Sequence, residues 1–438
     1  MKFNYKTFDE LQRDIQRLGL SIPFGEDLSC LRTEIKANRG IIPNRLATHP
    51  MEGCDGLDDG SPGELTFRRY ERFAAGGAGL IWLEAVAVTP LGRSNAHQVM
   101  ITEENVDRFR ELVDRIRTVA QETHGHNPYI VIQLTHSGRF GVNKKIVSHY
   151  DVLDKKAGLP ADFPVMTDEE LDELAELYIK AAHLSYKAGF DCVDVKACHR
   201  YLLSELLASH LRDGKYGGSY ENRTRFFKDV IGTIKNEVDI DLAVRINAYD
   251  AIAYPYGWGT DSEGNPALEE PKRFVQELEN LGVGLFNITA STPYLLPHIT
   301  RPYDQAGKFG YEPPEHQLVG VARLLNLARE IQRHIPDSVV VGTGYSWLRH
   351  FAPQVAAGVV EQGWAKVIGF GRTAFAYPDF ARDILTKGEM DRSKACITCT
   401  KCAELKGAGK ITGCVVRDPE IYVTPYRELM AEWAAKES

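Results

Sequence analysis

The stretch GLIWLEAVAV (Gly79–Val88) decides the fold, because it is apolar at almost every position rather than at alternate ones. Such a run fits a strand that is buried on both faces of a parallel sheet. Seven similar runs occur, and most are followed by an amphipathic helical stretch. They are Leu46–Met51, Tyr129–Leu134, Cys192–Ala197, Asp241–Ala248, Gly284–Ser291, Val339–Gly344 and Lys366–Arg372. Eight strand–helix units predict an α/β fold of the (β/α)₈ TIM-barrel type.

The helical stretches between these runs support the barrel. MTDEELDELAELYIKAAHLSYKAGF starts with Thr167 as N-cap and Glu170 three residues later, a capping box, and it closes at Gly189. Apolar residues recur at helical spacing over residues 319–334. The rival architecture, a doubly wound sheet, should carry a G-x-G-x-x-G turn directly after an early strand. No such turn is present in the sequence, since GGAGL (Gly76–Leu80) precedes a strand instead.

The chain divides into one large barrel with an extension at each end. We expect an N-terminal helical extension over residues 1–40, the barrel over residues 41–385, and a C-terminal cysteine-rich extension over residues 386–438, which is too short for a domain of ordinary size. Surplus length is expected in loops after the strands, chiefly residues 135–165, the stretch after Tyr201, and residues 249–267.

Charge and hydropathy exclude several classes of protein. A net charge of −8 without a basic cluster argues against nucleic acid or an anionic membrane surface as a partner. The N-terminus, MKFNYKTFDELQRDIQRLGL, lacks the apolar core of a signal peptide, and no window approaches a membrane span. Cysteines in a large chain without a secretion signal are more often reduced or metal-bound than paired in disulfides. We therefore expect a cytoplasmic protein.

Polar residues stand at the C-terminal ends of the predicted strands, where barrel enzymes place their active sites. Gln133 and Arg245 interrupt strands that should be aliphatic, and a buried polar group without a partner costs roughly 1–3 kcal/mol. They could form an internal polar network. The more specific interpretation is that they bind a planar, hydrogen-bonding ligand at the mouth of the barrel. Lys196, His199 and Tyr201 crowd another strand end, and three proton-handling groups so close together favour a catalytic role.

The last two predicted strands end in VGTGYS and GFGRTAF, which contain Gly344, Gly371 and Arg372. Glycines let backbone N–H groups approach phosphate oxygens, and an arginine adds a charge-assisted hydrogen bond. The alternative is a pair of tight turns without a ligand. Because barrels often bind phosphate after these two strands, we favour a phosphate site.

Half of the eight cysteines lie between Lys394 and Cys414, in KACITCTKCAELKGAGKITGC. Zinc sites also use C-x₂-C pairs, but they usually take two separated pairs. Three closely spaced cysteines and a remote fourth suit an iron–sulfur cubane better. The candidate ligands of a [4Fe–4S] cluster are Cys396, Cys399, Cys402 and Cys414.

These motifs together resemble the Old Yellow Enzyme family of FMN-dependent ene-reductases. The matching stretches, over roughly residues 41–426, are PNRLATHPMEG, AAGGAGL, QLTHSGR, AGFDCVDV, RYLLSELLASHLRDGKYGGSYENRTRF, VRI, VGTG, VIGFGR and CITCTKC…CVVRDP. The chain looks closest to the branch of 2,4-dienoyl-CoA reductase and trimethylamine dehydrogenase, which adds an iron–sulfur cluster. The resemblance implies that FMN binds to Pro50, Met51, Glu52, Gln133, Arg245, Gly344, Tyr345, Gly369, Gly371 and Arg372.

The catalytic motif departs from that family at two positions. The family has His-x-x-His or His-x-x-Asn, where the paired residues hold the substrate carbonyl oxygen, and then a tyrosine that donates a proton. Here His199 and Tyr201 are kept, Lys196 replaces the first histidine, and Arg200 replaces the usual glycine. A lysine could stabilise an enolate, phenolate or carboxylate oxygen more strongly than a neutral imidazole. The resemblance therefore implies the fold and cofactor, but not a simple enone substrate.

The resemblance implies reduction of an activated C=C bond by hydride transfer from FMN N5. An oxidative dehydrogenase, demethylase or dehydroxylase and a non-catalytic electron-transfer subunit are the alternatives. Dienoyl-CoA reductase-type relatives continue into FAD- and NAD(P)-binding domains, which we expect to be absent from a chain that stops at Ser438. Either NAD(P)H reduces FMN directly, or a ferredoxin, flavodoxin or reductase subunit feeds the cluster, which is the option we favour. We also expect a homo-oligomer.

Overall fold

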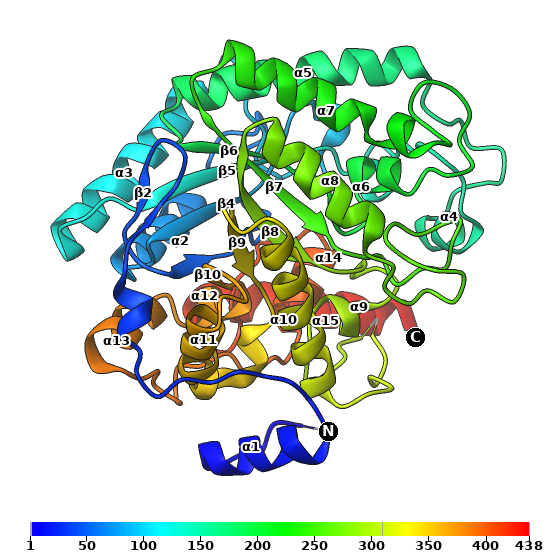
Figure 1. Cartoon of the computed structure of the whole chain (residues 1–438). Coiled ribbons are helices and arrows are strands. Elements are labelled where there is room, and N and C mark those ends of the chain that lie inside the picture. Colours follow the sequence, from blue (N-terminus) through cyan, green and yellow to red (C-terminus); the bar gives the residue numbers. More distant parts are fainter. Residues whose placement is uncertain (1, 309, 438) are drawn as a thin grey trace.

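The computed structural model describes residues 2–308 and 310–437, and eight parallel strands close into a barrel at its centre (Figure 1). β10 pairs with both β9 and β3, which closes the ring. The strands are β3 Leu46–Thr48, β4 Leu80–Ala87, β5 Tyr129–Thr135, β6 Cys192–Val195, β7 Asp241–Asn247, β8 Val283–Thr289, β9 Val339–Gly342 and β10 Val367–Phe370. Each coincides with one of the eight apolar runs, so the predicted TIM barrel is confirmed.

Helices surround the barrel (Figure 1). They are α2 Glu64–Ala75, α3 Val106–His124, α5 Asp168–Lys187, α7 Tyr220–Glu237, α8 Glu269–Asn280, α10 Gln317–His334, α11 Ala352–Glu361 and α13 Phe380–Lys387. The capping box at the start of α5 is confirmed: the Thr167 hydroxyl accepts a hydrogen bond from the Glu170 N–H, and the Glu170 carboxylate accepts one from the Thr167 N–H. Gly189 follows the end of α5 with φ of 87°, a conformation that favours glycine.

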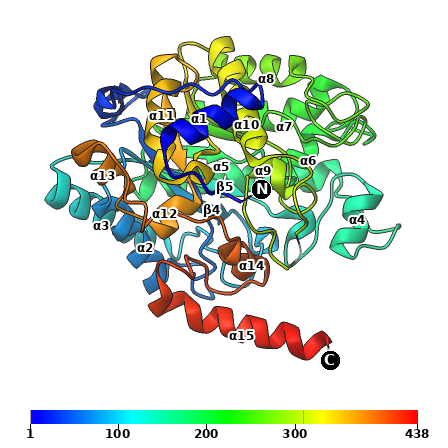
Figure 2. The same cartoon turned by 90° about the horizontal axis from the view of Figure 1, so that it is seen from below.

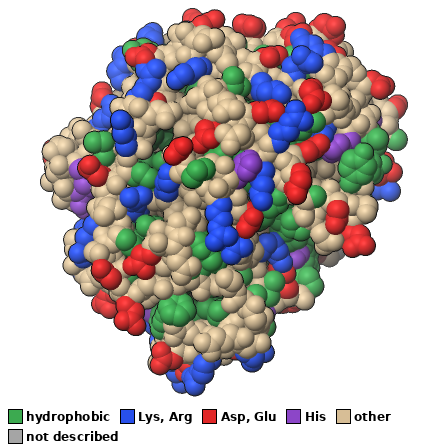
Figure 3. Space-filling view, viewed as in Figure 1, with side chains coloured by type: hydrophobic (Ala, Val, Ile, Leu, Met, Phe, Trp, Pro, Cys, Tyr) green, Lys and Arg blue, Asp and Glu red, His purple; other side chains and the backbone are tan. Residues whose placement is uncertain are grey.

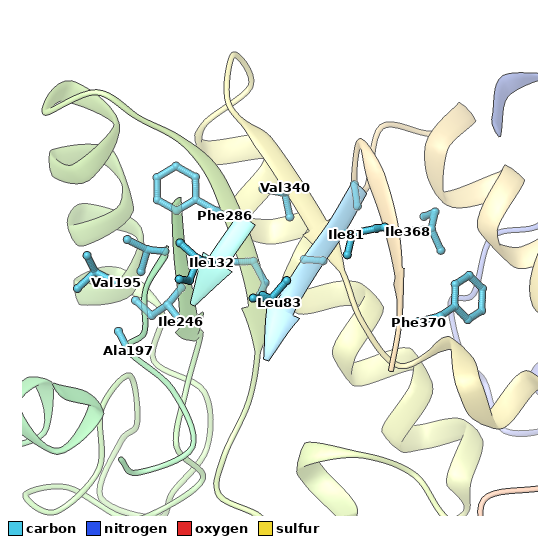
Figure 4. Close-up of a cluster of buried hydrophobic side chains, with 14 of the residues drawn as sticks. Ile81, Leu83, Ile132, Val195, Ala197, Ile246, Phe286, Val340, Ile368 and Phe370 are labelled. Atoms are coloured by element: carbon cyan, nitrogen blue, oxygen red, sulfur yellow. The ribbon is translucent and has the colours of Figure 1, made fainter. Parts of the chain in front are cut away.

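Both faces of the strands are buried, which explains why the runs are apolar throughout. On β4, Leu80 and Trp82 belong to a cluster inside the barrel, whereas Ile81 and Leu83 pack against the surrounding helices. Figure 4 shows the outer cluster, to which almost every strand of the barrel contributes.

The shorter elements lie in loops and at the chain ends. The loop helices are α4 Asp151–Ala157, α6 Leu202–Leu207, α9 Pro297–Thr300 and α12 Arg372–Ala376, with 3₁₀ turns η1 Ser29–Arg32, η2 Pro90–Gly92, η3 Gly138–Phe140 and η4 Tyr345–Phe351. The predicted N-terminal helix is α1 Phe8–Arg17. An antiparallel pair, β1 Ile35–Lys36 and β2 Ile41–Ile42, was not predicted, because two-residue strands leave no periodic signal.

The cysteine-rich extension contains α14 Lys401–Gly407 and α15 Pro419–Glu437, which lies along the edge of the molecule (Figure 2). The Thr412 N–H donates a hydrogen bond to the Gly53 carbonyl, 2.7 Å away, just after β3. Arg68 and Arg72 of α2 form ion pairs with Asp418. These contacts anchor the extension beside the carboxyl end of the first barrel strand. Over the described residues, no helix is both long and apolar enough to cross a membrane.

Candidate active site

A cavity of about 1090 Å³ lies at the carboxyl ends of the barrel strands. Tyr345 does not line it, because the Tyr345 ring is fully buried and packs against Phe370. All other predicted catalytic and flavin-binding residues do line it: Pro50, Met51, Glu52, Gln133, Lys196, His199, Tyr201, Arg245, Gly344, Gly369, Gly371 and Arg372. Pockets for one drug-sized ligand hold roughly 300–1,000 Å³, so this cavity has room for a mononucleotide and a second small molecule.

The floor of the cavity is organised by a buried carboxylate, Asp194 of β6. Asp194 accepts hydrogen bonds from Gln133 Nε2 at 2.6 Å, from Trp82 Nε1 at 2.9 Å, and from the Arg245 backbone N–H at 2.7 Å. Burial raises the pKa of Asp194 to about 6. The network orients Gln133 and fixes β7 beside it, so the polar network weighed from the sequence exists and also forms the floor of a ligand-sized cavity.

Two side chains on this floor have a buried polar atom without a hydrogen-bond partner among the described residues. Arg245 is 8% exposed, and its guanidinium forms no hydrogen bond or ion pair with the residues described. The His49 ring bonds Asn287 through Nδ1, but its buried Nε2 has no partner. Burial, with Arg245 nearby, holds the pKa of His49 well below its ordinary value, so this ring is neutral. Because buried polar atoms are nearly always satisfied, these atoms indicate where a ligand would bind.

The opposite end of the cavity has the features of an anion site. Gly344 has φ of 107°, which favours glycine. A Cβ at Gly369 would lie 2.2 Å from the His49 ring, so no larger residue fits there. Arg372 donates to the Pro302 carbonyl at 2.6 Å, while its buried Nη1 has no partner. Glycines beside a guanidinium that has one nitrogen without a partner fit a phosphate group.

Arg301, which the sequence analysis missed, also lines the cavity. It follows α9 in the loop after β8, and no pattern in the sequence marks it. Its guanidinium forms no ion pair with any residue in the described ranges, and burial lowers its pKa to about 10. With Arg245 and Arg372, Arg301 is therefore the third arginine in the cavity that has no ion pair among the described residues.

Cationic side chains dominate the cavity, although the whole chain is acidic. Nine lysines and arginines line it, against Glu52 and Glu404 as the acidic side chains. On the outer face seen in Figure 3, by contrast, basic and acidic side chains are interspersed. A locally positive, concave site concentrates anionic ligands.

The turn after β6 presents the predicted catalytic residues to the cavity. His199 and Arg200 both have φ near +60°, which costs a non-glycine residue about 1–3 kcal/mol. The Arg200 side chain is buried in an ion pair with Asp250 at 2.9 Å, and it also donates to the Tyr256 carbonyl. This pair explains how an arginine occupies a position where the family usually has glycine.

Lys196 is buried beside this turn and has no carboxylate partner among the residues that the structure describes. It is 6% exposed, and its Nζ lies 4.0 Å from the centroid of the Tyr201 ring. Burial lowers the pKa of Lys196 to about 8. The His199 Nε2 is 3.2 Å from Thr289 Oγ1, and burial with nearby Arg245 holds the pKa of His199 well below its ordinary value. The pair therefore offers a cation and a neutral imidazole to one ligand.

The Tyr201 hydroxyl belongs to a small polar cluster. It lies 2.9 Å from the Tyr294 hydroxyl and 3.1 Å from Lys406 Nζ, and Lys406 forms an ion pair with Glu52 at 3.3 Å. Lys406 belongs to α14 of the extension, and Tyr294 to the loop after β8. The sequence analysis missed both, because nothing local indicates that these segments meet at Tyr201.

All four cysteines of the CITCTKC…C motif line one small pocket beside the cavity, and Arg372 lines both. The Thr398 N–H lies 3.4 Å from Cys396 Sγ, and the Arg417 N–H lies 3.3 Å from Cys414 Sγ. Backbone donors to sulfur are typical of iron–sulfur sites, where they tune the potential. Cys54 and Cys198 are fully buried and do not line the cavity, which fits a role in packing.

The sequence and the fold both have relatives among known proteins. The model of the NADH:flavin oxidoreductase / NADH oxidase family matches residues 33–269. An NADPH dehydrogenase of Halalkalibacterium halodurans is 34% identical over 214 residues, which is 47% of this chain and 60% of that protein. The chain therefore spans less than two thirds of that relative.

Two solved structures share the fold at 20% sequence identity. A 2-naphthoyl-CoA reductase, in complex with 2-naphthoyl-CoA, matches with a TM-score of 0.68 over 89% of this chain and 57% of that chain. An old yellow enzyme homologue of Zymomonas mobilis matches with a TM-score of 0.60 over 88% of this chain and 99% of that chain. Since the family match takes in more than half of the 438 residues and much of the barrel, the chain belongs to the NADH:flavin oxidoreductase / NADH oxidase family.

Proposed function

We propose that this protein is an FMN- and [4Fe–4S]-dependent oxidoreductase that reduces an activated C=C bond in an α,β-unsaturated carbonyl, a thioester, or a cyclic or aromatic enone-like substrate. The observation that carries the proposal is the arrangement of Lys196, His199 and Tyr201 on the cavity that Arg245 and Gln133 also line. FMN, when bound, would supply hydride chemistry at its N5 atom.

The residues around the cavity fit FMN. Gln133 and Arg245 would bind the pyrimidine edge of the flavin, where the unpaired Arg245 charge would stabilise an anionic ring. Arg372 would bind the phosphate, with Arg301 as an additional cation near it. Pro50, Met51 and Glu52 would lie under the ring, and Gly344, Gly369 and Gly371 would let the backbone approach the phosphate. Tyr345 would contribute at most its backbone.

Lys196, His199 and Tyr201 would each have a separate role in the reaction. Lys196 and neutral His199 would donate hydrogen bonds to the substrate oxygen, whose negative charge grows as the double bond is reduced. The lysine provides a full charge in a water-poor site, which suits an oxygen that becomes enolate-like. The Tyr201 Oη–H would then protonate the α-carbon. The cationic lining of the cavity favours a substrate that carries or develops negative charge.

We assign Cys396, Cys399, Cys402 and Cys414 to a [4Fe–4S] cluster. All four cysteines line one small pocket. Zinc sites usually take two separated C-x₂-C pairs. Three closely spaced cysteines and a remote fourth suit a cubane, in which each thiolate binds a different iron.

The proposed electron donor follows from the assignment of the cluster. A cluster site whose pocket shares Arg372 and Cys402 with the flavin cavity supports electron delivery by a ferredoxin, flavodoxin or reductase subunit, with direct reduction by NAD(P)H as the alternative. We retain the three segments of residues 1–40, 41–385 and 386–438, a cytoplasmic setting and a homo-oligomeric state as predictions.

An oxidative dehydrogenase, demethylase or dehydroxylase is the alternative within this family. Amine oxidation would bring a cationic substrate to a cavity in which Lys196, Arg245 and Arg301 have no carboxylate partner among the described residues. Like charges disfavour such binding, so the cavity supports reduction of an anionic or polarised substrate.

Anaerobic half-reactions test the proposal. Dithionite-reduced enzyme is mixed with enones or enoyl thioesters, oxidised enzyme is mixed with methylamines, and flavin absorbance is followed in each case. We expect reoxidation by one of the first two classes and a loss of at least tenfold in that rate in Tyr201→Phe, with photoreduction of the flavin retained. If methylamines instead reduced the oxidised enzyme, the oxidative alternative would replace this proposal. An undiminished rate in Tyr201→Phe would remove Tyr201 as the acid.

A further inference from the structure

The cysteine-rich extension places a cation at the hydroxyl of the barrel's candidate acid. Lys406 Nζ is 3.1 Å from Tyr201 Oη, 3.5 Å from Tyr294 Oη and 3.3 Å from a Glu52 carboxylate oxygen. Lys406 stands four residues after Cys402, so the two share one face of α14, and both line the cavity. The segment that carries the cluster ligands therefore also contributes a charge to the site built by the barrel.

We propose that Lys406 is a positioning residue that orients the Tyr201 hydroxyl and stabilises the phenolate left when Tyr201 gives up its proton. This inference rests on the proposed function, in which Tyr201 is the acid. Burial raises the pKa of Tyr201 well above its ordinary value, which would make it a poor donor, and the Lys406 charge opposes that effect. A cation beside the oxygen thus makes a buried phenol more acidic than burial alone would leave it.

The proton that Tyr201 gives up in this step is replaced through the neighbouring hydroxyl group of Tyr294. The Tyr201 O–H bond breaks, a C–H bond forms at the substrate α-carbon, and a phenolate remains beside the Lys406 ammonium. Tyr294, a partly exposed residue whose hydroxyl lies 2.9 Å away, returns a proton to Tyr201 and regains one from water. Burial disfavours the charge on Lys406, but Glu52 and the two phenols outweigh it and raise the pKa of Lys406 well above its ordinary value, so Lys406 keeps its proton.

The other charged groups near Tyr201 are not placed to stabilise its phenolate oxygen in the same way. The titratable groups that face Tyr201 are Glu52 after β3, Lys196 after β6, Tyr294 and Arg301 in the loop after β8, and Lys406 in α14. Lys196 lies over the face of the Tyr201 ring, and no hydrogen bond joins it to the Tyr201 oxygen. Among the described residues, Lys406 is the cation that is hydrogen-bonded to that oxygen.

The test measures the acidity of Tyr201 directly. The holoenzyme is labelled with 3-fluorotyrosine, its Tyr201 resonance is assigned by Tyr201→Phe, and the ¹⁹F signal is titrated with pH. In Lys406→Met and in Lys406→Gln, we expect the Tyr201 midpoint to rise by about 1–3 pH units, whereas Lys406→Arg keeps it near the wild-type value. Lys410→Met, which removes an ion-paired lysine of the same extension, is the matched control and should leave the midpoint unchanged.

Iron and flavin contents are compared in every variant, so a misfolded extension is recognised, and Lys406→Gln replaces Lys406→Met if the latter does not accumulate. Equal midpoints in wild type and both neutral variants, or a lower midpoint in the neutral variants, overturn the inference. Turnover rates of the variants distinguish a failure of the role of Tyr201 from a failure of the role of Lys406. If Tyr201→Phe is not slowed, Tyr201 is not the acid and that part of the proposed function fails. If Tyr201→Phe is slowed but Lys406→Met behaves like Lys410→Met, only the role of Lys406 fails.

Discussion

Replacing Lys196 with methionine should make the protein more stable and less active. The Lys196 ammonium is 6% exposed and has no carboxylate partner in the part of the chain that the structure describes. Its pKa falls from 10.5 to about 8, chiefly through burial, which corresponds to about 3 kcal/mol of unfavourable free energy in the charged form. Methionine has a similar length and no charge, so it should fill the same space without that cost.

The difference in the free energy of unfolding between wild type and Lys196→Met should depend on pH. Below pH 8, Lys196 is protonated in both the folded and the unfolded chain, and the full cost of burying its charge applies. Between pH 8 and 10.5 the unfolded chain binds a proton that the folded chain does not, so wild-type stability rises relative to the variant. Lys196→Met should therefore be more stable by up to about 3 kcal/mol at pH 7, and this gap should shrink as the pH rises towards 10.

Urea unfolding followed by tryptophan fluorescence, at matched cofactor content and several pH values, measures the gap. Lys187→Met, at an exposed site, is the control and should change the free energy of unfolding by no more than about 0.5 kcal/mol. In the same samples, kcat/KM of Lys196→Met should fall by about 10²–10³-fold if Lys196 holds the developing oxyanion. A destabilised variant, or a gap that does not vary between pH 7 and 10, would refute the reasoning.

Three further predictions follow from the site. Arg245→Met should weaken FMN binding at least tenfold, seen as a lower flavin-to-protein absorbance ratio after dialysis, whereas unchanged flavin retention would contradict its place at the flavin ring. Cys399→Ala should lose most of its iron while circular dichroism of the barrel is preserved; full iron content would rule Cys399 out as a ligand. The kcat of wild type should fall as the pH rises through about 8, where Lys196 loses its charge, and Lys196→Arg should shift that limb to higher pH.

The fold followed from the sequence because each strand is buried on both faces and therefore reads as an apolar run. Residues at strand ends, such as Gln133 and Arg245, were predictable for the same reason, since topology alone brings those ends together. Lys406 and Arg301 were not, because their positions depend on how a loop and an extension pack on the barrel. Tyr345 follows Gly344 in the sequence, but its side chain faces the core, which the motif VGTGYS does not reveal.

The departures from the family motif are also clearer in the structure. Arg200 replaces a glycine at a left-handed position, and only its buried pair with Asp250 shows how the strain is offset. That pair joins residues fifty positions apart, so no local pattern could predict it.

Cofactor analysis of anaerobically purified protein tests the central claim most directly. Flavin, iron, acid-labile sulfide and zinc are quantified per chain, together with the visible spectrum before and after dithionite. The account predicts one FMN, four irons and four sulfides per chain, with absorbance near 400 nm that bleaches on reduction. Zinc without iron, or a protein that binds no FMN, would contradict it.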